Sequence, residues 1–312
     1  MRNAGSSSAN EQGEGIAVDG SGNSYVAGSF NGTVDFDGAG GAPPLVSVDQ
    51  DVFVAKYDTE GTLLWVRNPG SSSSHEYGLG IAVDGSGNSY VTGDFYGTVD
   101  FDGVGSAPPL VAVNNDYFVA KYDPDGNLIW VRNPGSSASG ETGQGIALDG
   151  SGNSYVTGYF SGTVDFDGAG SVPPLVAAYT DHFVAKYDSD GNLLWVRNSG
   201  SSNSDELGRG IAVDGSGKSY VTGYFSGTVD FDPGPGTALL ETVTGYLKHF
   251  LLSYTPTGEL GDADTAPPAV SAPDLDALSD SGASGTDNVT NADPLTFTGT
   301  GEAGAAVELF AD

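Results

Sequence analysis

Gly80-Ile81-Ala82-Val83-Asp84-Gly85-Ser86-Gly87 is the stretch that decides the fold, because near-identical copies of it occur four times in the chain. The other copies begin at Gly15, Gly145 and Gly210, so the step from one copy to the next is always 65 residues. Trp65, Trp130 and Trp195 keep the same step. Self-similarity at a fixed step is the signature of a repeat architecture, in which each copy forms one structural unit.

Each copy contains four short strand patterns and no helical period. In the first copy, apolar or aromatic runs occupy residues 15–19, 24–30, 51–58 and 63–68. Turn-forming residues separate these runs, as in Asp-Gly-Ser-Gly-Asn at residues 19–23. Short strands at even spacing, bounded by Gly, Asn and Asp, predict an all-β unit.

Several of the expected strands are apolar on both faces. Leu63, Leu64, Trp65 and Val66 are consecutive in the sequence. A two-layer sandwich would leave one polar face on each sheet and give an alternating pattern. A propeller blade is covered on both sides by its neighbours, so its strands can be apolar throughout. A β-helix coil would be shorter than this repeat, and tandem sandwich domains would be longer, at about 100 residues each.

The fold class that we predict is therefore an all-β propeller of four repeats, with one four-stranded blade in each. The expected blades span residues 15–68, 80–133, 145–198 and 210–261 of a repeat domain at residues 1–261. The fourth copy has Ser253 where Lys56, Lys121 and Lys186 stand, and no Leu-Leu-Trp-Val segment follows it. Met1 aligns with Val66, inside a strand. We expect from these ends that the chain is a fragment of a longer protein and of a larger propeller.

Three segments of the second copy, at residues 80–93, 97–102 and 118–130, resemble the bacterial β-propeller repeat called SBBP. Residues 230–236, Asp-Phe-Asp-Pro-Gly-Pro-Gly, are similar to that family's usual form. The resemblance extends over residues 1–261. It implies a propeller, usually on secreted or cell-surface bacterial proteins of unassigned biochemical role, and it implies no catalytic residues.

The composition changes after Gly261. Residues 262–272 are rich in Pro, Ala and Asp and are expected to form a linker. Residues 273–312 resemble the opening of the bacterial immunoglobulin-like repeats found in large adhesins. Because such a sandwich needs about 100 residues, we expect a truncated immunoglobulin-like domain, a partial β-sandwich.

The charge of the chain excludes several classes of partner. Its 41 acidic and 10 basic residues give a formal net charge of −31, which disfavours nucleic acids and anionic membrane surfaces. The chain has no cysteine, so disulfides, zinc–thiolate sites and cysteine nucleophiles are excluded. No apolar run reaches the ~18 residues of a membrane span, and no signal peptide is visible near Met1.

The strongest candidate site is the repeated Thr-Val-Asp-Phe-Asp segment. In an extended chain, residues two apart point the same way, so both carboxylates of a pair share one side and the Phe between them faces the other. A hard cation with oxygen ligands would relieve the repulsion within a pair, which makes calcium the candidate cofactor. A solvated acidic rim is the alternative. The four pairs are Asp35/Asp37, Asp100/Asp102, Asp165/Asp167 and Asp230/Asp232.

Other motifs favour structural roles. The Asp-x-Asp-Gly-Asn segments at residues 123–127 and 188–192 resemble half of an EF-hand loop, but they lie between strands and are expected to be hairpin turns. The repeated Trp residues could stack sugars, although packing between blades fits their apolar surroundings better. The repeated Lys residues are expected to snorkel or to pair with Asp. The Gly-x-Gly-x-x-Gly at residues 299–304 opens no helix and is expected to be a turn.

The sequence thus predicts a non-enzymatic, extracellular structural or interaction module of the adhesion type, on a bacterial surface protein. Its partner would be a protein or a glycan at a cell surface. A glycan-binding, lectin-like propeller, with or without a dependence on calcium, is the alternative. The His residues do not recur at one repeat position, and no Gly-x-Ser-x-Gly or His-Glu-x-x-His motif occurs. The ligand, the blade number and the oligomeric state are left open.

Overall fold

A computed structural model of the 312-residue chain divides it into two units, residues 1–261 and 262–312. The structure describes residues 10–38, 40–70, 75–103, 105, 107–133, 140–168, 170–200, 204–232, 237–242, 246–261, 274–275 and 297–298. In the second unit these are only the short strands β20 (Asp274–Leu275) and β21 (Phe297–Thr298), which pair with each other. The predicted linker, most of the predicted immunoglobulin-like segment and the predicted turn at residues 299–304 lie outside the described residues.

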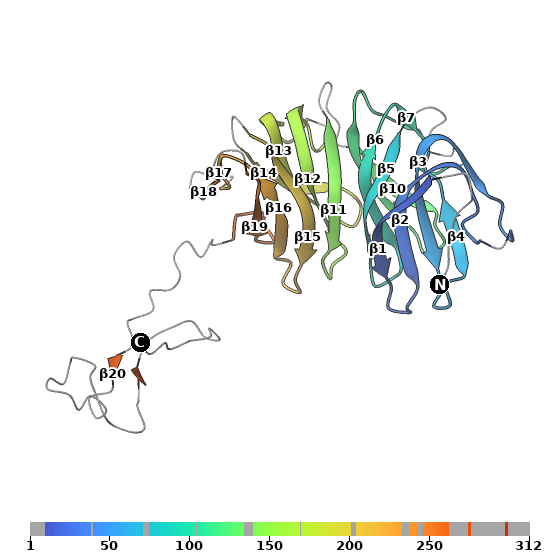
Figure 1. The fold of residues 1–312 in the computed structure, drawn as a ribbon, viewed down its shortest axis with the longest axis horizontal. Helices are drawn as coiled ribbons and strands as arrows, with labels where there is room; N and C mark the ends of the chain where they lie inside the picture. The colour runs from blue at the N-terminus through green and yellow to red at the C-terminus, as the bar shows by residue number, and fades with distance from the viewer. Residues whose placement is uncertain are drawn as a thin grey trace. The chain divides into compact units, whose positions relative to one another are not determined.

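The described part of the first unit contains four main antiparallel sheets, one from each repeat, which stand side by side in Figure 1. Strands that follow one another in the sequence are neighbours in the sheet. The first sheet contains β1 (Asn10–Val18), β2 (Ser24–Val34), β3 (Leu45–Tyr57) and β4 (Leu63–Arg67). The second contains β5 (Glu76–Val83), β6 (Ser89–Phe95), β9 (Asp116–Tyr122) and β10 (Leu128–Arg132). The third contains β11 (Glu141–Leu148), β12 (Ser154–Val164), β13 (Leu175–Tyr187) and β14 (Leu193–Ser199).

Over the described residues, the fourth sheet has three strands, β15 (Glu206–Val213), β16 (Ser219–Phe225) and β19 (Lys248–Tyr254). This matches the expectation that the last repeat lacks a convincing fourth strand. The repeats also carry an extension of the second and third strands. In the second and fourth blades it forms separate ribbons, β7 (Thr98–Val99) with β8 (Leu110–Val111), and β17 (Thr228–Asp230) with β18 (Leu239–Glu241). The all-β propeller architecture is thereby confirmed.

The first strand of each blade begins earlier than the apolar run indicated. β1 starts at Asn10, five residues before Gly15, and its pairing with β2 shifts register between Gly13 and Gly15. Such a bulge adds a residue to one strand and hides the regular alternation that marks a strand in the sequence. The polar start of the strand, Asn-Glu-Gln, therefore gave no strand signal.

These first strands are the ones that touch across blades. β5 contacts both β1 and β11, and β11 contacts β15. Glycine makes the approach possible, because a Cβ on Gly80 would lie 3.3 Å from the Cα of Gly145 in the next blade. The repeated Gly-Ile-Ala segments therefore form the inner edge of the propeller, where the strands of neighbouring blades approach closely at Gly80 and Gly145.

The blades are joined by one contact that recurs at each junction. The indole Nε1 of Trp130 donates a 3.0 Å hydrogen bond to the carbonyl oxygen of Ser189 in the third blade. A Cβ on Gly191 of that same turn would lie 2.9 Å from the ring of Trp130. Trp65 and Trp195 make the same contacts with the turns that contain Gly126 and Gly258. The prediction that the Trp residues pack between blades is confirmed.

A buried lysine completes each junction. The Nζ of Lys121 donates a 3.2 Å hydrogen bond to the same Ser189 oxygen and lies 4.9 Å from the ring centroid of Tyr90. Lys56 and Lys186 do the same at their junctions, and Lys186 also lies 3.5 Å from Asp149. These ammonium groups are buried and bind the next blade, so they reach it directly and do not snorkel to solvent.

The two outermost blades each present an uncovered face. Ile16 of the first blade is 70% exposed, whereas the equivalent Ile81 and Ile146 are each 8% exposed. In the fourth blade, Leu251 is 68% exposed, whereas the equivalent Val119 and Val184 are fully buried. The faces that form junctions elsewhere are therefore open to solvent at both ends of the row of blades.

Substitution of Trp130 tests the role of this junction. Trp130 is 8% exposed, and Ile129 beside it in the same strand is 50% exposed. Trp130→Ala should lower the free energy of unfolding by about 3–5 kcal/mol, because it removes a large buried side chain and leaves a cavity. The matched Ile129→Ala should cost under about 1 kcal/mol. The free energies of unfolding are measured by urea titration. Equal losses for Trp130→Ala and Ile129→Ala would show that the indole does not join the blades.

Candidate functional site

The four Asp pairs lie where the sequence placed them, in the loop between the second and third strands of each blade. The Phe between the two carboxylates is buried in every repeat, at Phe36, Phe101, Phe166 and Phe231, while the carboxylates are part-exposed. The predicted division of the segment into an apolar and an acidic side is therefore confirmed. In the first three blades the backbone at the pairs has left the strand and turns, whereas Asp230 of the fourth blade is the last residue of β17 and pairs with Leu239.

The carboxylates organise that loop by accepting main-chain hydrogen bonds. In the second blade, the amide of Gly105 donates to both carboxylates of its loop, with distances of 2.9 Å to Asp100 Oδ2 and 2.8 Å to Asp102 Oδ1. Asp102 Oδ2 also accepts from the amide of Ala107 at 2.5 Å. The third loop repeats the pattern at Gly170, whose amide donates to Asp165 and Asp167.

The first loop shows the same arrangement around Asp37. The amide of Gly40 donates to Asp35 Oδ2 at 3.0 Å and to Asp37 Oδ1 at 2.8 Å, and the amide of Ala42 donates to Asp37 Oδ2. The sequence-based prediction treated Asp37 as a carboxylate that would need a cation to offset repulsion from Asp35. In the structure both oxygens of Asp37 already accept loop amides, so its role there is to close the loop.

The fourth loop differs from the other three in the main-chain donors to its first Asp. Here Asp230 Oδ1 accepts the amide of Asp232 at 3.1 Å and that of Ala238 at 2.8 Å. Asp232 is half-buried, and its negative charge adds to burial in raising the pKa of the Tyr254 hydroxyl, as that of Asp102 does for Tyr122 in the second blade. The four pairs are therefore not equivalent, whereas the repeated sequence led us to expect four like sites.

Calcium binding at the pairs stays a prediction. Each pair supplies two carboxylates, whereas calcium takes about six to eight oxygen ligands. Over the described residues no group of three or more His, Cys, Asp or Glu side chains is placed to hold a metal. The donor set of one loop is thus a poor fit on its own, and a bound ion would have to share carboxylate oxygens with main-chain amides. Calcium binding therefore stays a prediction for all eight proposed ligands, which are Asp35, Asp37, Asp100, Asp102, Asp165, Asp167, Asp230 and Asp232.

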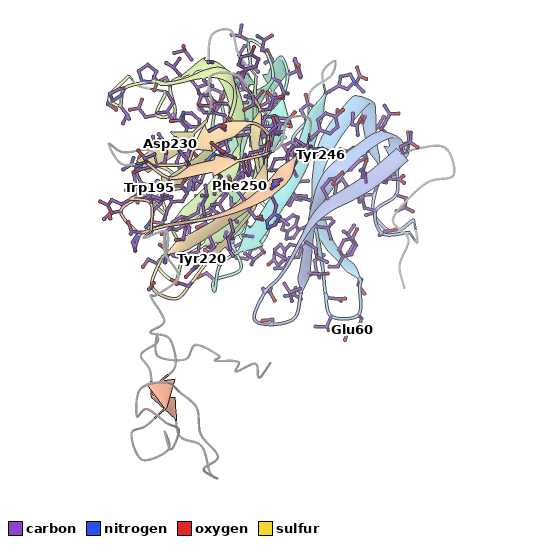
Figure 2. The ribbon with its side chains drawn as sticks, turned by 60° about the vertical axis from the view of Figure 1, so that its left-hand side comes forward. Glu60, Trp195, Tyr220, Asp230, Tyr246 and Phe250 are labelled. Carbon is purple, nitrogen blue, oxygen red and sulfur yellow. The ribbon has the colours of Figure 1, made fainter. Side chains whose placement is uncertain are left out.

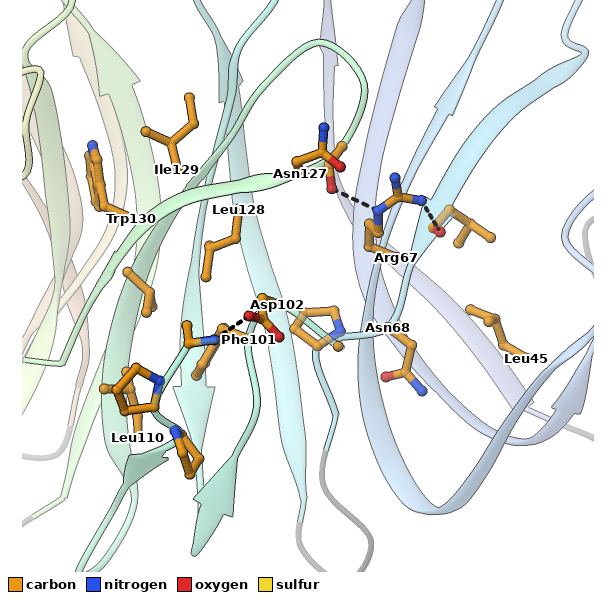
Figure 3. Close-up of a pocket in the computed structure, with 18 of the residues that line it drawn as sticks. Leu45, Arg67, Asn68, Phe101, Asp102, Leu110, Asn127, Leu128, Ile129 and Trp130 are labelled. Atoms are coloured by element: carbon orange, nitrogen blue, oxygen red, sulfur yellow. Dashed lines mark hydrogen bonds between the residues drawn. The ribbon is translucent and has the colours of Figure 1, made fainter. Parts of the chain in front are cut away.

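A groove of about 1030 Å³ runs between the first and second blades beside these loops (Figure 3). Its walls are mainly apolar, with Leu45, Leu110, Leu128 and Ile129, and Asp102 and Arg67 supply the charges. Arg67 is already engaged, because it donates hydrogen bonds of 2.7 and 2.8 Å to the carbonyl oxygens of Gly126 and Asp125. A smaller groove of about 270 Å³, beside Arg132 and Asp167, lies between the second and third blades.

The positions at which the repeats differ most gather at one end of the blades. Alignment of the copies shows that the turn glycines recur in all four and the Trp and the Lys in the first three, whereas one position in the first strand reads Gln12, Tyr77, Thr142 and Leu207. Its partners in the second strand are Ser29, Asp94, Tyr159 and Tyr224. We call the following residues the divergent surface: Gln12, Tyr77, Thr142, Leu207, Ser29, Asp94, Tyr159, Tyr224, Gln50, Asn115, Thr180, Leu247, Glu14, Leu79, Gln144 and Arg209.

Hydrogen bonds join the divergent surface from blade to blade. The hydroxyl of Tyr77 in the second blade lies 3.3 Å from Gln50 Oε1 in the first. Asn115 Nδ2 in the second blade lies 3.3 Å from Thr142 Oγ1 in the third. Arg209 of the fourth blade donates 2.8 Å bonds to Gln144 of the third blade and to Tyr224 of its own. Differences between the copies thus produce one composite surface of rings, amides and one guanidinium.

Asp94 is the least expected member of this surface, because the other copies have Ser or Tyr there. Burial raises the pKa of its carboxyl to about 7, and a side-chain hydrogen bond with Asn115 partly offsets the effect. An acid in this environment costs stability when it ionises. The divergent surface therefore includes a buried carboxyl with a raised pKa.

The histidines do not extend this surface into an acid–base site. His182 is fully buried, where Nδ1 lies 3.0 Å from Ser199 Oγ and Nε2 lies 3.3 Å from the hydroxyl of Tyr254. Burial lowers the pKa of His182 to about 4. Its equivalents are Val52, Tyr117 and His249, and Tyr117 likewise bonds to Tyr187 of the next blade. The expectation that the His residues do not recur at one repeat position was therefore wrong for His182 and His249, because the fourth copy is two residues longer before its third strand. This Ser–His pair is therefore part of a blade junction.

Sequence reasoning missed the divergent surface, although the signal was present in the chain. The four copies can be compared position by position without any relative, and the variable positions stand out against the repeated ones. The Asp-x-Asp-Gly-Asn segments were correctly read as hairpin turns, because Asp123 accepts the amides of Asp125 and Asn127 and Gly126 has φ +81°.

Comparisons with known proteins agree with this architecture. The family model for the SBBP β-propeller repeat matches residues 4–34 and 135–159, and the model for a bacterial Ig-like domain matches residues 265–312. The chain therefore carries SBBP-type propeller repeats followed by an Ig-like segment. Over the part of the chain that the structure describes, no helix is long and apolar enough to cross a membrane.

More distant likenesses add context. An uncharacterized WD repeat-containing protein of Acanthamoeba polyphaga mimivirus is 27% identical over 207 residues, which is 58% of this chain and 15% of that protein. A protein of unknown function from Bacteroides caccae is 10% identical, with 80% of each chain covered and a TM-score of 0.37. A gluconolactonase from Xanthomonas campestris is 16% identical, covering 68% of this chain and 56% of its own, with a TM-score of 0.30.

The buried carboxyl of Asp94 gives a pH-dependent prediction. Its folded pKa lies above the unfolded value, so its stability contribution is complete below pH 3.8 and is lost as the pH rises through about 7. Asp94→Asn should therefore raise the stability at pH 8 by up to about 4 kcal/mol, from roughly 1.4 kcal/mol per pKa unit. The gain should shrink toward pH 4. Exposed Asp125→Asn is the control, and a gain for Asp94→Asn that is equal at both pH values would refute the assignment.

The calcium prediction has its own test. If the pairs bind calcium, millimolar Ca²⁺ should raise the melting temperature above the value in NaCl of matched ionic strength, because the ion binds only the folded chain. Asp100→Asn combined with Asp102→Asn should reduce that rise. Equal rises of the melting temperature in the two salts would contradict calcium binding. The Asp pairs would then serve only as hydrogen-bond acceptors that organise the loop.

Proposed function

We propose that this chain is a non-enzymatic extracellular interaction module of the adhesion type, carried by a bacterial surface protein. One observation carries the proposal: the blades share a nearly invariant framework, yet their differences are gathered into the divergent surface. A chain selected only for stability has no reason to concentrate its differences there or to keep buried Asp94. Partners at a cell surface, protein or glycan, would bind to this end.

Three other features support this reading. The SBBP-type repeats and the bacterial Ig-like segment are both structural and interaction modules, and the second favours a surface protein. The net charge of −31 keeps such a chain soluble and directs it away from nucleic acid. Tyr77, Tyr159 and Tyr224 combine a ring with a polar hydroxyl, and such side chains are enriched at interfaces.

A glycan-binding propeller is the second candidate, and the composition of the divergent surface favours it. Tyr rings from three blades lie among amides and hydroxyls, which can both donate to and accept from sugar hydroxyl groups. The guanidinium of Arg209 adds a fixed planar donor beside the rings of Tyr224 and Tyr159, at 5.2 and 5.9 Å from their centroids. Calcium at the Asp loops would make this binding metal-dependent.

The test uses substitutions that the repeats themselves supply. The full chain is displayed on a heterologous bacterial cell, and the cells are passed over surfaces coated with extracellular matrix proteins or with neutral and acidic oligosaccharides. Arg209→Gln gives the fourth blade the residue that the third blade has at this position, Gln144. Tyr159→Ser gives the third blade the residue of the first, Ser29. We expect attachment to at least one coating and a loss of tenfold or more with either variant.

Ser189→Pro is the matched control. It gives the third blade the residue that the second blade has at this position, Pro124, and it lies at the end of the blade opposite to the divergent surface. It should leave both attachment and melting temperature unchanged. Attachment to oligosaccharides would select the glycan-binding candidate, and attachment to protein alone would select the protein partner. No attachment above cells that lack the chain, or attachment that both variants leave intact, would refute the proposal.

A further inference from the structure

A second set of carboxylates is buried where one blade meets the next, beside the divergent surface. The first strand of each later blade, β5, β11 or β15, contacts the third strand of the blade before it, β3, β9 or β13. Each of these first strands begins with a Glu that is fully buried, which is Glu76, Glu141 or Glu206. Each third strand contributes an Asp that is at most 5% exposed, which is Asp51, Asp116 or Asp181. Every described junction therefore has a buried carboxylate on either side.

The two carboxylates lie close together at the first two junctions. At the first, Glu76 is near enough to Asp51 for a side-chain hydrogen bond. At the second, the amide of Glu141 donates a 2.7 Å hydrogen bond to the carbonyl oxygen of Asn115, the residue before Asp116. Burial raises the pKa of both Asp carboxyls, and the hydrogen bonds that they accept only partly offset it. Such a pair is costly to ionise unless a positive charge is near.

An Asn side chain joins each Asp and leaves two buried oxygens without a donor. Asn68 Nδ2 lies 3.0 Å from Asp51 Oδ2, and Asn133 Nδ2 lies 3.2 Å from Asp116 Oδ2. In all four side chains the other oxygen, Oδ1, is buried and has no hydrogen-bond partner within the described part of the chain. No described Lys or Arg forms an ion pair with either Asp. Buried acceptors of this kind normally have a partner, so these oxygens indicate a bound group.

The fourth blade carries the opposite charge at the position of the Asp. Lys248 pairs with Phe225 in the fourth sheet, as Asp116 pairs with Phe95 in the second. It lies two residues before Phe250, which Figure 2 labels, and it is exposed. The described blades that precede another blade thus have Asp here, whereas the last described blade has an ammonium group. The carboxylate therefore accompanies the junction and its Glu.

We propose that each of the first two junctions binds a calcium ion through one Asp, one Asn and one Glu. The ligands are Asp51, Asn68 and Glu76 at the first junction and Asp116, Asn133 and Glu141 at the second. Calcium takes about six to eight oxygen ligands, so main-chain carbonyl oxygens and water would complete the shell. The ion offsets the repulsion between the two carboxylates and links one blade to the next. This site is separate from the Asp pairs of the loops, and it goes beyond the proposed interaction module.

Calorimetric titration of the full chain with calcium chloride, after removal of metal with EGTA, tests the ligand set. Asp116→Asn and Glu141→Gln should each lower the number of bound ions by one, because each removes a carboxylate from the second junction. The double variant should also lose only one ion, since both side chains hold the same one. Asp125→Asn, in an exposed turn, is the matched control and should leave the number unchanged.

Melting temperatures distinguish a bound ion from a proton shared by the two carboxyls. In EGTA, Asp116→Asn should melt above the parent chain, because it removes a buried charge, and in millimolar calcium the order should reverse. A shared proton would leave the order the same in both solutions and would refute the proposal.

Amide exchange of the unmodified chain decides the matter if the variants do not fold. Calcium should slow exchange at residues 115–117 and 141, on the two sides of the second junction. Absence of saturable binding, an unchanged number of ions in both single variants, or exchange slowed only in the loop of Asp100 and Asp102 would overturn the proposal.

Discussion

The contact of an indole ring with a glycine in the next blade is the constraint on which the rest of this structure depends. Trp130 lies against Gly191, and any side chain at that glycine would collide with the ring. The same turn gives its Ser189 carbonyl to both Trp130 and Lys121. Because the turn is itself closed by Asp188, whose carboxylate accepts the amides of Asp190 and Asn192, each blade offers a rigid acceptor to the blade before it.

This constraint explains which positions vary between the copies and which do not. The Trp and the Lys of one blade and the turn Gly of the next meet at every described junction, and the three blades that have a described successor all keep the Trp and the Lys. The fourth blade has no described successor, and there Ser253 replaces the lysine and the tryptophan is absent. At the opposite end of the blades the repeated contacts are the bonds of Asn68, Asn133 and Asn198 to Asp51, Asp116 and Asp181, and the neighbouring side chains differ between the copies. The divergent surface is the part of the molecule that the junctions do not determine.

Much of the fold and part of the site could be predicted from the sequence. The 65-residue step, the paired turns and the doubly apolar strands indicated the propeller, and strand alternation indicated the buried Phe within each Asp pair. The early start of β1 was missed, because a bulge and polar residues hide it. Contacts that depend on packing were missed too. The hydrogen bonds that Asp37 accepts from main-chain amides depend on how its loop folds back. The raised pKa of Asp94 depends on its burial in the folded chain.

A double-mutant cycle between Trp130 and Gly191 tests the central claim most directly. Gly191→Ala strains a turn with φ +79° and also drives a methyl group into the indole, and Trp130→Ala removes only the second effect. We expect a coupling of about 1 kcal/mol or more in unfolding free energy. The control is Gly126→Ala, whose turn lies against Trp65, and it should be additive with Trp130→Ala. Additivity within about 0.5 kcal/mol for Trp130 and Gly191 as well would contradict the account.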